Sequence, residues 1–323
     1  MANNEMKLGK NKVEFLGVVK EQKLKEIKTE NGESITGKLV LKCGEFKEVD
    51  VNVFVGKYNK DGKTVSKKYE TLKDFIDGKL PTMASAKEDE EPTIVNIWGN
   101  EPFTANIEEN MYKSKQSGNV VTNPQFRLGF ANITVKQDVE EKDFKAEFDV
   151  DIYVDSITEE VDPSTNEETG RAIIKGYLPL YGGLVMPLEL VAGMIKGDDD
   201  EDLNMAELVL DNVREGDTFS AYGDINFERI ITQTKSSGKG FGRAKIETKT
   251  DYIHEFNILY GEIVEDEDKM FEEEDIKQAL VQRDSKMDEI KNKEDEDKED
   301  KSQKRGLGSS NSEGSARRQR RGF

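Results

Sequence analysis

The chain has 323 residues, of which 36% are charged and 34% hydrophobic, and its formal net charge is -19 at pH 7. Its single cysteine, Cys43, excludes a disulfide framework and a cysteine-rich metal site. No stretch approaches the roughly 18 consecutive apolar residues of a membrane span, so we expect a soluble, cytoplasmic protein with no membrane partner.

The first half of the chain is predicted to form strands with one short helix among them. Val13–Ile27 alternates apolar and polar residues, which predicts a strand, and Ile35–Val55 predicts a hairpin. Lys67–Asp77 follows as a short helix. Thr93–Phe103 predicts a fourth strand, from which a long hairpin leads through Phe130 to a fifth strand.

The second half repeats this order. Three residues of the hairpin recur 139 positions later, with Gly176, Leu178 and Leu190 after Gly37, Leu39 and Val51. The helix recurs at an offset of 138, with Leu210 and Val213 after Leu72 and Phe75. On the fourth strand the offset is 124, with Phe219 and Tyr222 after Val95 and Trp98. We therefore predict a duplicated domain whose loops differ in length.

Five strands with a helix between the third and the fourth are the order of the oligonucleotide/oligosaccharide-binding (OB) fold, a small Greek-key barrel. The predicted fold is mainly β, with one OB barrel over residues 10–136 and another over residues 145–264. Residues 265–323 form a charged tail, acidic and then basic, which is partly helical and largely disordered.

The stretch from Gly216 to Ile225, with its Gly-Asp turn, alternating apolar residues and bend glycine, looks like the fourth strand of that fold. With the duplication, the chain resembles the tandem OB-fold single-stranded-DNA-binding proteins of bacteriophages. The resemblance implies a function in phage DNA replication or recombination, in the host cytoplasm. Such proteins commonly end in an acidic tail, whereas here the acidic stretch is followed by a basic end.

OB-fold proteins bind single strands by stacking bases on outward aromatic rings and by placing cations along the phosphates. If the apolar residues of each hairpin point inward, their neighbours point outward, and on the fourth strands Trp98 and Tyr222 occupy equivalent outward positions. A packing role beneath the long hairpin or at a domain contact is the alternative for these two rings. The predicted outward residues of the hairpins and the loop after them are Lys42, Phe54, Tyr58, Tyr177 and Tyr181.

The hairpins between the fourth and fifth strands are predicted to supply cations. In the second copy Thr234–Lys245 is rich in glycine and contains four basic residues, one aromatic residue and no acid. A backbone clamp and an ordinary solvated hairpin are both consistent with this composition. The candidate residues of the two hairpins are Tyr112, Lys113, Arg127, Lys235, Lys239, Phe241, Arg243 and Lys245.

Catalysis finds little support in the sequence. His254 is the only histidine and lies in an alternating strand, where we predict a structural role. Without a second histidine or a cysteine cluster, nucleophile pairs and common transition-metal sites lack their usual residues. We expect no enzyme activity, no cofactor and no metal.

The tail separates its charges. Residues 265–300 contain 17 acidic and 7 basic side chains, whereas residues 301–323 contain 1 and 7. Met270–Lys293 could form an amphipathic helix, and the tail could bind replication proteins, touch DNA or only solubilise the chain. The predicted function is non-catalytic single-stranded DNA binding. The alternative is a structural or host-interaction protein whose barrels bind protein.

Overall fold

The computed structural model describes residues 6–30, 32–45, 47–59, 61–99, 106–114, 117–129, 131–197, 201–235 and 246–306. The chain divides into two compact units, Met1–Asn110 with Asn123–Arg283, and Met111–Thr122 with Asp284–Phe323. The first unit contains the residues of both predicted barrels except 111–122, which fall into the second unit. No helix of the described residues is long and apolar enough to cross a membrane.

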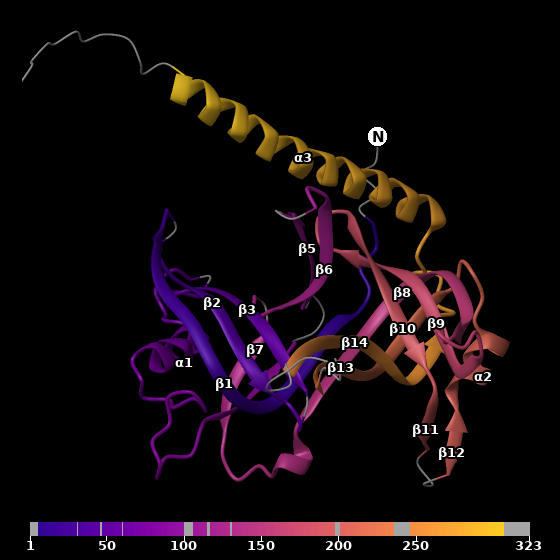
Figure 1. The fold of residues 1–323 in the computed structure, drawn as a ribbon, viewed down its shortest axis with the longest axis horizontal. Coiled ribbons are helices and arrows are strands. Elements are labelled where there is room, and N and C mark those ends of the chain that lie inside the picture. The colour runs from indigo at the N-terminus through magenta and orange to yellow at the C-terminus, as the bar shows by residue number, and fades with distance from the viewer. Residues whose placement is uncertain are drawn as a thin grey trace, which may run out of the picture. The chain divides into compact units, whose positions relative to one another are not determined.

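The first half of the chain folds into a ring of strands with one helix (Figure 1). Its elements are β1 (Asn11–Thr29), β2 (Gly32–Lys42), β3 (Glu48–Gly56), α1 (Lys67–Ile76), β4 (Ile94–Trp98), β5 (Ile107–Lys113), β6 (Val120–Arg127) and β7 (Asn132–Lys136). β1 pairs antiparallel with β2 and β4, β2 with β3, and β4 with β7. The parallel pairing of β3 with β6 closes the ring.

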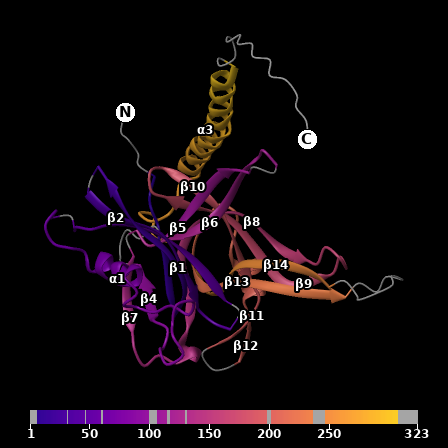
Figure 2. The same cartoon turned by 60° about the vertical axis from the view of Figure 1, so that its left-hand side comes forward.

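The second half forms a ring of the same kind. After a 3-10 turn, η1 (Glu141–Asp143), its elements are β8 (Lys145–Val161), β9 (Glu168–Leu180), β10 (Leu184–Ala192), β11 (Met194–Lys196), β12 (Asp202–Asn204), α2 (Met205–Asn212), β13 (Thr218–Lys235) and β14 (Ile246–Ile263). β8 pairs with β9 and β13, β9 with β10, and β13 with β14, and β10 pairs parallel with β14. In Figure 2, β13 and β14 run side by side as a long ribbon.

Both rings have the strand order of the OB fold, with a helix between the third and fourth strands. The predicted fold class is therefore confirmed. In the first ring the fourth and fifth strands are each interrupted, so that β4 with β5 and β6 with β7 take the places that β13 and β14 take in the second. The short hairpin of β11 and β12 precedes α2 and has no counterpart among the described strands of the first ring.

The alternating apolar residues fill the rings as expected. Leu39, Leu41, Val51, Leu178 and Leu190 are all buried, and they belong to one apolar cluster that extends through both rings. Removing a side chain of this size from water stabilises the fold by about 1.5 to 3 kcal/mol. The core is therefore continuous, although the strands close into two rings.

The strand registers show which residues of the two rings correspond. β1 has a bulge after Val19 and β8 has one after Val154. Trp98 lies opposite Glu14, and Glu14 is five residues before Val19. Tyr222 lies opposite Asp149, and Asp149 is five residues before Val154. The registers thus support the predicted equivalence of Trp98 and Tyr222.

The equivalence predicted for the second strands is wrong by four residues. In the first ring, Leu39 lies opposite Gln22, and Gln22 is three residues after Val19, where the bulge begins. In the second ring, the residue three positions after Val154 is Ile157, and it lies opposite Ile174. Ile174 therefore takes the place that the offset of 139 gave to Leu178. A shift by an even number of residues leaves the same face inward, so the apolar pattern hides it.

The two rings are joined by a ladder that the sequence analysis did not anticipate. β1 pairs antiparallel with β8 over six residues, from Asn11 opposite Val150 to Leu16 opposite Lys145. Val13 lies opposite Phe148, and each stands six residues before the bulge of its own strand. The ladder thus has a local two-fold relation near this pair, and a single hydrogen-bonded sheet runs through both rings.

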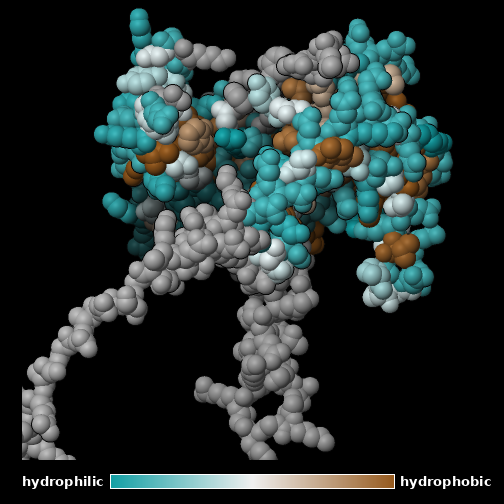
Figure 3. All heavy atoms as spheres, turned by 90° about the horizontal axis from the view of Figure 1, so that it is seen from above, coloured by the Kyte–Doolittle hydropathy of each residue, from teal (hydrophilic) through white to brown (hydrophobic). Residues whose placement is uncertain are grey.

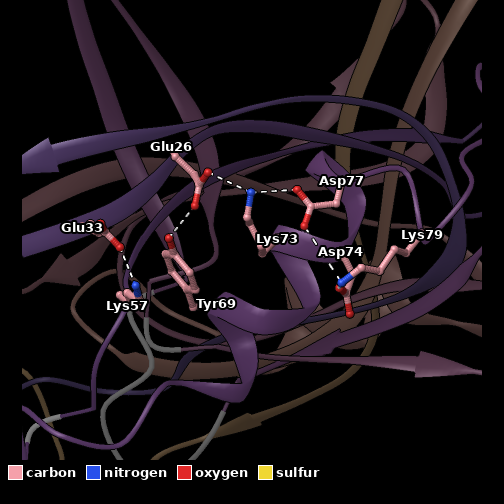
Figure 4. Close-up of polar contacts among 8 residues, drawn as sticks. All are labelled: Glu26, Glu33, Lys57, Tyr69, Lys73, Asp74, Asp77 and Lys79. Carbon is pink, nitrogen blue, oxygen red and sulfur yellow. Dashed lines mark hydrogen bonds and ion pairs between the residues drawn. The ribbon is translucent and has the colours of Figure 1, made fainter.

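A polar cluster connects α1 to the C-terminal part of β1 (Figure 4). The Glu26 carboxylate accepts hydrogen bonds from the Tyr69 hydroxyl at 2.8 Å and from Lys73 Nζ at 2.9 Å. Lys73 Nζ also donates to Asp77 at 2.7 Å, one turn further along the chain. These bonds lower the pKa of Glu26, the hydrogen bond from Lys73 contributing most. Burial, together with the bond to Glu26, raises the pKa of Tyr69 to about 12.

The C-terminal segment begins as part of the second barrel rather than as a tail. Phe271 and Ile276 are buried against Val185 and Tyr177, and the Phe271 amide donates to Thr218 Oγ1 at 2.7 Å. Ile276 lies in α3 (Glu273–Gly306). The C-terminal segment up to Arg283 therefore belongs to the first unit, whereas the chain beyond Arg283 falls into the second unit together with residues 111–122.

Candidate nucleic-acid interface

A groove of about 520 Å³ opens on the outer side of the first barrel, where β13 and β14 of the second barrel contribute to its wall. Side chains from six strands line it: Lys38 of β2, Glu48, Asp50 and Asn52 of β3, Asn110 of β5, Asn123, Pro124, Gln125 and Phe126 of β6, Phe227 of β13, and His254 of β14. We call it the amide groove, because four of these residues have amide side chains.

Aromatic rings form one side of the amide groove. The rings of Phe227 and His254 stack with their centroids 4.5 Å apart at 27°. Phe227 in turn contacts Phe126, at 5.3 Å between centroids. The two strands place Phe227 directly opposite His254, which explains the stack. His254 is exposed and Phe227 is partly buried, so an aromatic surface is open to the groove.

The stack is anchored in both barrel cores. Phe126 contacts Phe15 of the first barrel, with centroids 5.0 Å apart. Phe227 contacts Phe256 at 5.8 Å, and Phe256 contacts Phe148 of the second barrel at 5.4 Å. Pairs at such distances and tilted angles contribute beyond their buried area. The aromatic side of the groove is thus held by the packing of both barrels.

Amide side chains also line the groove. Asn52 Nδ2 donates to Gln125 Oε1 at 3.1 Å, across the parallel junction of β3 and β6. Asn110 and Asn123 line the same groove. An amide offers both a donor and an acceptor, and such groups can bind the edge of an unstacked base.

The charges along the groove are largely balanced. Lys38 Nζ lies 2.7 Å from Asp50, and Lys20 pairs with Glu48. Two lysines, one on β1 and one on β2, and two carboxylates on β3 therefore neutralise one another. Partial burial lowers the pKa of His254, so its imidazole is neutral at pH 7. The groove can present donors, acceptors and a ring surface, but no strong positive field.

Several predicted aromatic residues lie on the surface. Phe54 and Tyr58 are exposed on and just after β3, and Tyr181 is 82% exposed in the turn after β9. Figure 3 shows one face of the molecule, on which apolar residues form small separate groups on a mainly hydrophilic surface. Phe54, Tyr58 and Tyr181 do not line the amide groove.

Trp98 and Tyr222 are both accessible in part. Trp98 is half-buried and Tyr222 is 37% exposed. Burial and a hydrogen bond with Glu147 raise the pKa of Tyr222 to about 12. Lys145 Nζ lies 2.8 Å from Glu147 and 3.1 Å from Glu14, the residue opposite Trp98. Both rings thus lie beside the ladder that joins the barrels.

Other predicted contacts are already engaged within the chain. Tyr177 points out of its barrel as expected, but the segment that contains Phe271 packs on it. Lys42 Nζ lies 3.0 Å from Glu141, and Arg127 Nη1 lies 2.9 Å from Glu108. A ligand of these residues would have to compete with these contacts or share the groups that make them.

Apart from Arg127, the hairpin candidates fall outside the first unit or outside the described residues. Tyr112 is exposed and Lys113 Nζ donates to the carbonyl of Lys291 at 2.9 Å, both within the second unit. Lys239, Phe241, Arg243 and Lys245 lie outside the described residues, as does the side chain of Lys235.

Sequence reasoning missed Phe227 and His254 as parts of a site. His254 was predicted to be structural, yet it is exposed and lines the groove. The sequence did contain a signal for Phe227. On β13, Phe219 and Ile225 point into the barrel, and Phe227 follows on the same face near the end of the barrel, where that face is only partly buried. His254 similarly extends the inward series of Phe256, and a polar ring in such a series marks the point where the core ends.

No group of three or more metal-binding side chains occurs in the part of the chain that the structure describes. This part therefore offers no preformed metal centre beside the groove.

Among solved structures, the single-stranded DNA binding protein from Thermus aquaticus is similar to this chain. A deletion mutant of it matches at 13% identity with a TM-score of 0.40, covering 80% of this chain and 95% of that chain. The wild-type protein matches at 13% identity with a TM-score of 0.39, covering 80% and 94%. No curated protein matches the sequence. The model of the YorF family matches residues 10–316, which is nearly the whole length, and the chain therefore belongs to the YorF family.

Proposed function

We propose that the protein binds single-stranded DNA without catalysis, in the replication or recombination of phage DNA. The observation that carries this proposal is the amide groove, in which the exposed His254 ring stacks on Phe227 beside four amide side chains. Bases of a single strand are unstacked and can place their rings on such a surface. The outer side of β2 and β3, where the groove lies, is the surface on which OB folds bind oligonucleotides.

Phosphate contacts would come from other parts of the chain, because the described cations beside the groove are paired with acids. The basic hairpin with Lys239 and Arg243 is the best source, since it has no acidic residue. Its cations would follow the backbone of the strand while the groove takes bases. The tail beyond Arg283 would then bind replication proteins or compete with DNA for this hairpin.

The direct test is a titration of the full chain with labelled single-stranded oligonucleotides at two salt concentrations. His254→Ala should weaken binding by roughly 1 to 3 kcal/mol, the usual contribution of one base on an aromatic ring. His254→Phe is the matched control, because it keeps a ring on Phe227, and it should bind nearly as well as the original chain. Equal affinity of the Ala and Phe variants would contradict stacking at His254.

Two further variants separate the groove from the fourth strands. Trp98→Ala and Tyr222→Ala should each lose roughly 1 to 3 kcal/mol if bases also stack beside the ladder. Lys239→Ala and Arg243→Ala should weaken binding to all sequences alike and lower the salt slope by roughly 0.7 for each lost phosphate contact.

A second candidate function is protein binding, as a structural or host-interaction protein. The observation that favours it is the exposure of apolar side chains away from the groove, with Tyr181 at 82% and Met194 at 60%. In that case no oligonucleotide should bind at either salt concentration. Tyr181→Ser and Met194→Ser should instead reduce capture of a protein partner.

A further inference from the structure

We infer that the amide groove selects between bases, and that it prefers cytosine and adenine, which have exocyclic amino groups, to thymine. This inference rests on the proposed function, since it concerns the base that the groove takes from a single strand. It goes beyond that function because stacking alone tolerates every base. The selection would come from the polar atoms that line the groove beside the stack.

The amide pair in the groove offers one donor and one acceptor to a base. Asn52 uses its amide nitrogen on Gln125 Oε1, which leaves the carbonyl oxygen of Asn52 as an acceptor and the amide nitrogen of Gln125 as a donor. This pair alone fits the edge of every base, because each edge contains both a donor and an acceptor. The amides therefore bind a base but do not choose it.

Two carboxylates lie on the same wall as the amide of Asn52. Asp50 and Glu48 line the groove, and each engages one lysine through one of its oxygens, Oδ2 of Asp50 with Lys38 and Oε1 of Glu48 with Lys20. An ionised carboxylate only accepts hydrogen bonds. Lys38 also lines the groove and contributes about three donors, whereas the two ionised carboxylates together offer about eight acceptor sites. Acceptors therefore exceed donors on this wall, and the excess favours a base that donates.

The bases differ in the group that they would present to these carboxylates. Cytosine has an amino donor at N4 and adenine has one at N6, whereas thymine has the acceptor O4 at the corresponding position. Carboxylates pair with the amino group of cytosine, and amides pair with adenine. A thymine in the same place would turn a carbonyl oxygen toward Asp50, and neither oxygen could donate.

Phosphate attraction does not mask this choice at the groove. Lys38 of the lining and the neighbouring Lys20 are paired with these two carboxylates, so both add little attraction that is independent of sequence. Contacts with bases then decide the relative affinities of different strands.

The test compares oligo(dC), oligo(dT) and oligo(dU) of equal length by fluorescence anisotropy with the full chain. All three are pyrimidine strands, and oligo(dU) separates the effect of O4 from that of the thymine methyl group. We expect oligo(dC) to bind at least about fivefold more tightly than oligo(dT) and oligo(dU), the lower end of the discrimination that one well-placed base contact gives.

Asp50→Asn should reduce the preference, because an amide can donate to O4 of thymine. The matched control is Glu189→Gln, which removes a similar cross-strand acid–lysine contact, Glu189 with Lys175 at 3.5 Å, from the other barrel and outside the groove. Both variants change the net charge by one, so a general electrostatic effect would raise the affinities of both variants alike and leave the ratio of oligo(dC) to oligo(dT) unchanged.

The outcomes are distinct. A ratio that falls toward one in Asp50→Asn and persists in Glu189→Gln supports the inference. Equal affinities of the original chain for all three strands, or a ratio that survives Asp50→Asn, would overturn the inference and leave the proposed function intact. No binding to any strand would overturn both.

Discussion

The buried ion pair between Arg283 and Glu109 gives the sharpest prediction about stability. Arg283 Nε lies 2.9 Å and Nη2 lies 2.6 Å from the two carboxylate oxygens of Glu109, so the guanidinium binds both. Only 11% of the Arg283 side chain and 3% of the Glu109 side chain are exposed. The pair ties the start of α3 to β5 of the first barrel.

Arg283→Met keeps much of the apolar stem but leaves the Glu109 carboxylate buried without its partner. Breaking a buried pair in this way typically costs about 3 to 5 kcal/mol. With an m-value of about 3 kcal/mol/M, the urea midpoint should fall by about 1 M or more.

Two controls make the measurement specific. Lys277→Met breaks the pair of Lys277 with Glu273, whose side chains are 60% and 66% exposed, and should cost less than about 1 kcal/mol. Arg283→Met combined with Glu109→Leu should recover most of the stability, because it removes both charges. If Arg283→Met costs no more than Lys277→Met, or if the double variant is as unstable as the single, the reasoning is refuted.

Three other predictions concern the tail, an exposed carboxyl group and the thiol. Removing residues 284–323 should leave the melting temperature of the barrels nearly unchanged, whereas removing residues 265–323 should lower it clearly, because residues up to 283 belong to the barrel unit; similar losses would contradict this boundary. The pKa of Glu26 is lowered in the folded chain, so its contribution to stability is present above its unfolded pKa and is lost as the pH falls through the folded value; Glu26→Gln should therefore flatten the melting temperature between about pH 5 and pH 3, and an unchanged profile would argue against it. Burial raises the pKa of Cys43 to about 12, so a thiol reagent at pH 8 should modify it only at the rate of unfolding; rapid modification of the native chain would show that the site is open.

The fold could be predicted from the sequence because apolar and polar residues alternate along the strands of an OB barrel. Leu39 and Leu41 alternate with lysine and valine, and both are buried. The same alternation also limited the prediction of equivalent residues. Two alternating strands can be aligned equally well after any shift by an even number of residues. The offset of 139 therefore placed Leu178 where the strand register places Ile174.

The candidate site was far less readable, because it is assembled from both barrels. Gln125 and Asn52 come from the junction of β3 and β6, whereas His254 and Phe227 come from the ribbon of the other barrel. Nothing local in either stretch indicates that they share a groove. Exposed aromatic residues such as Tyr181 were easier to predict, since alternation or a turn composition already points them outward.

The ladder of β1 with β8 has a consequence for the evolution of the chain. An antiparallel pair related by a local two-fold axis is what two identical barrels would form in an isologous dimer. If a single barrel is expressed alone, residues 11–16 become an unprotected edge strand, which invites pairing with a second copy. Fusion in one chain releases the two halves from the identity that a dimer imposes. One half could then keep an open groove while the other accepted Phe271 and the start of α3 on its outer side.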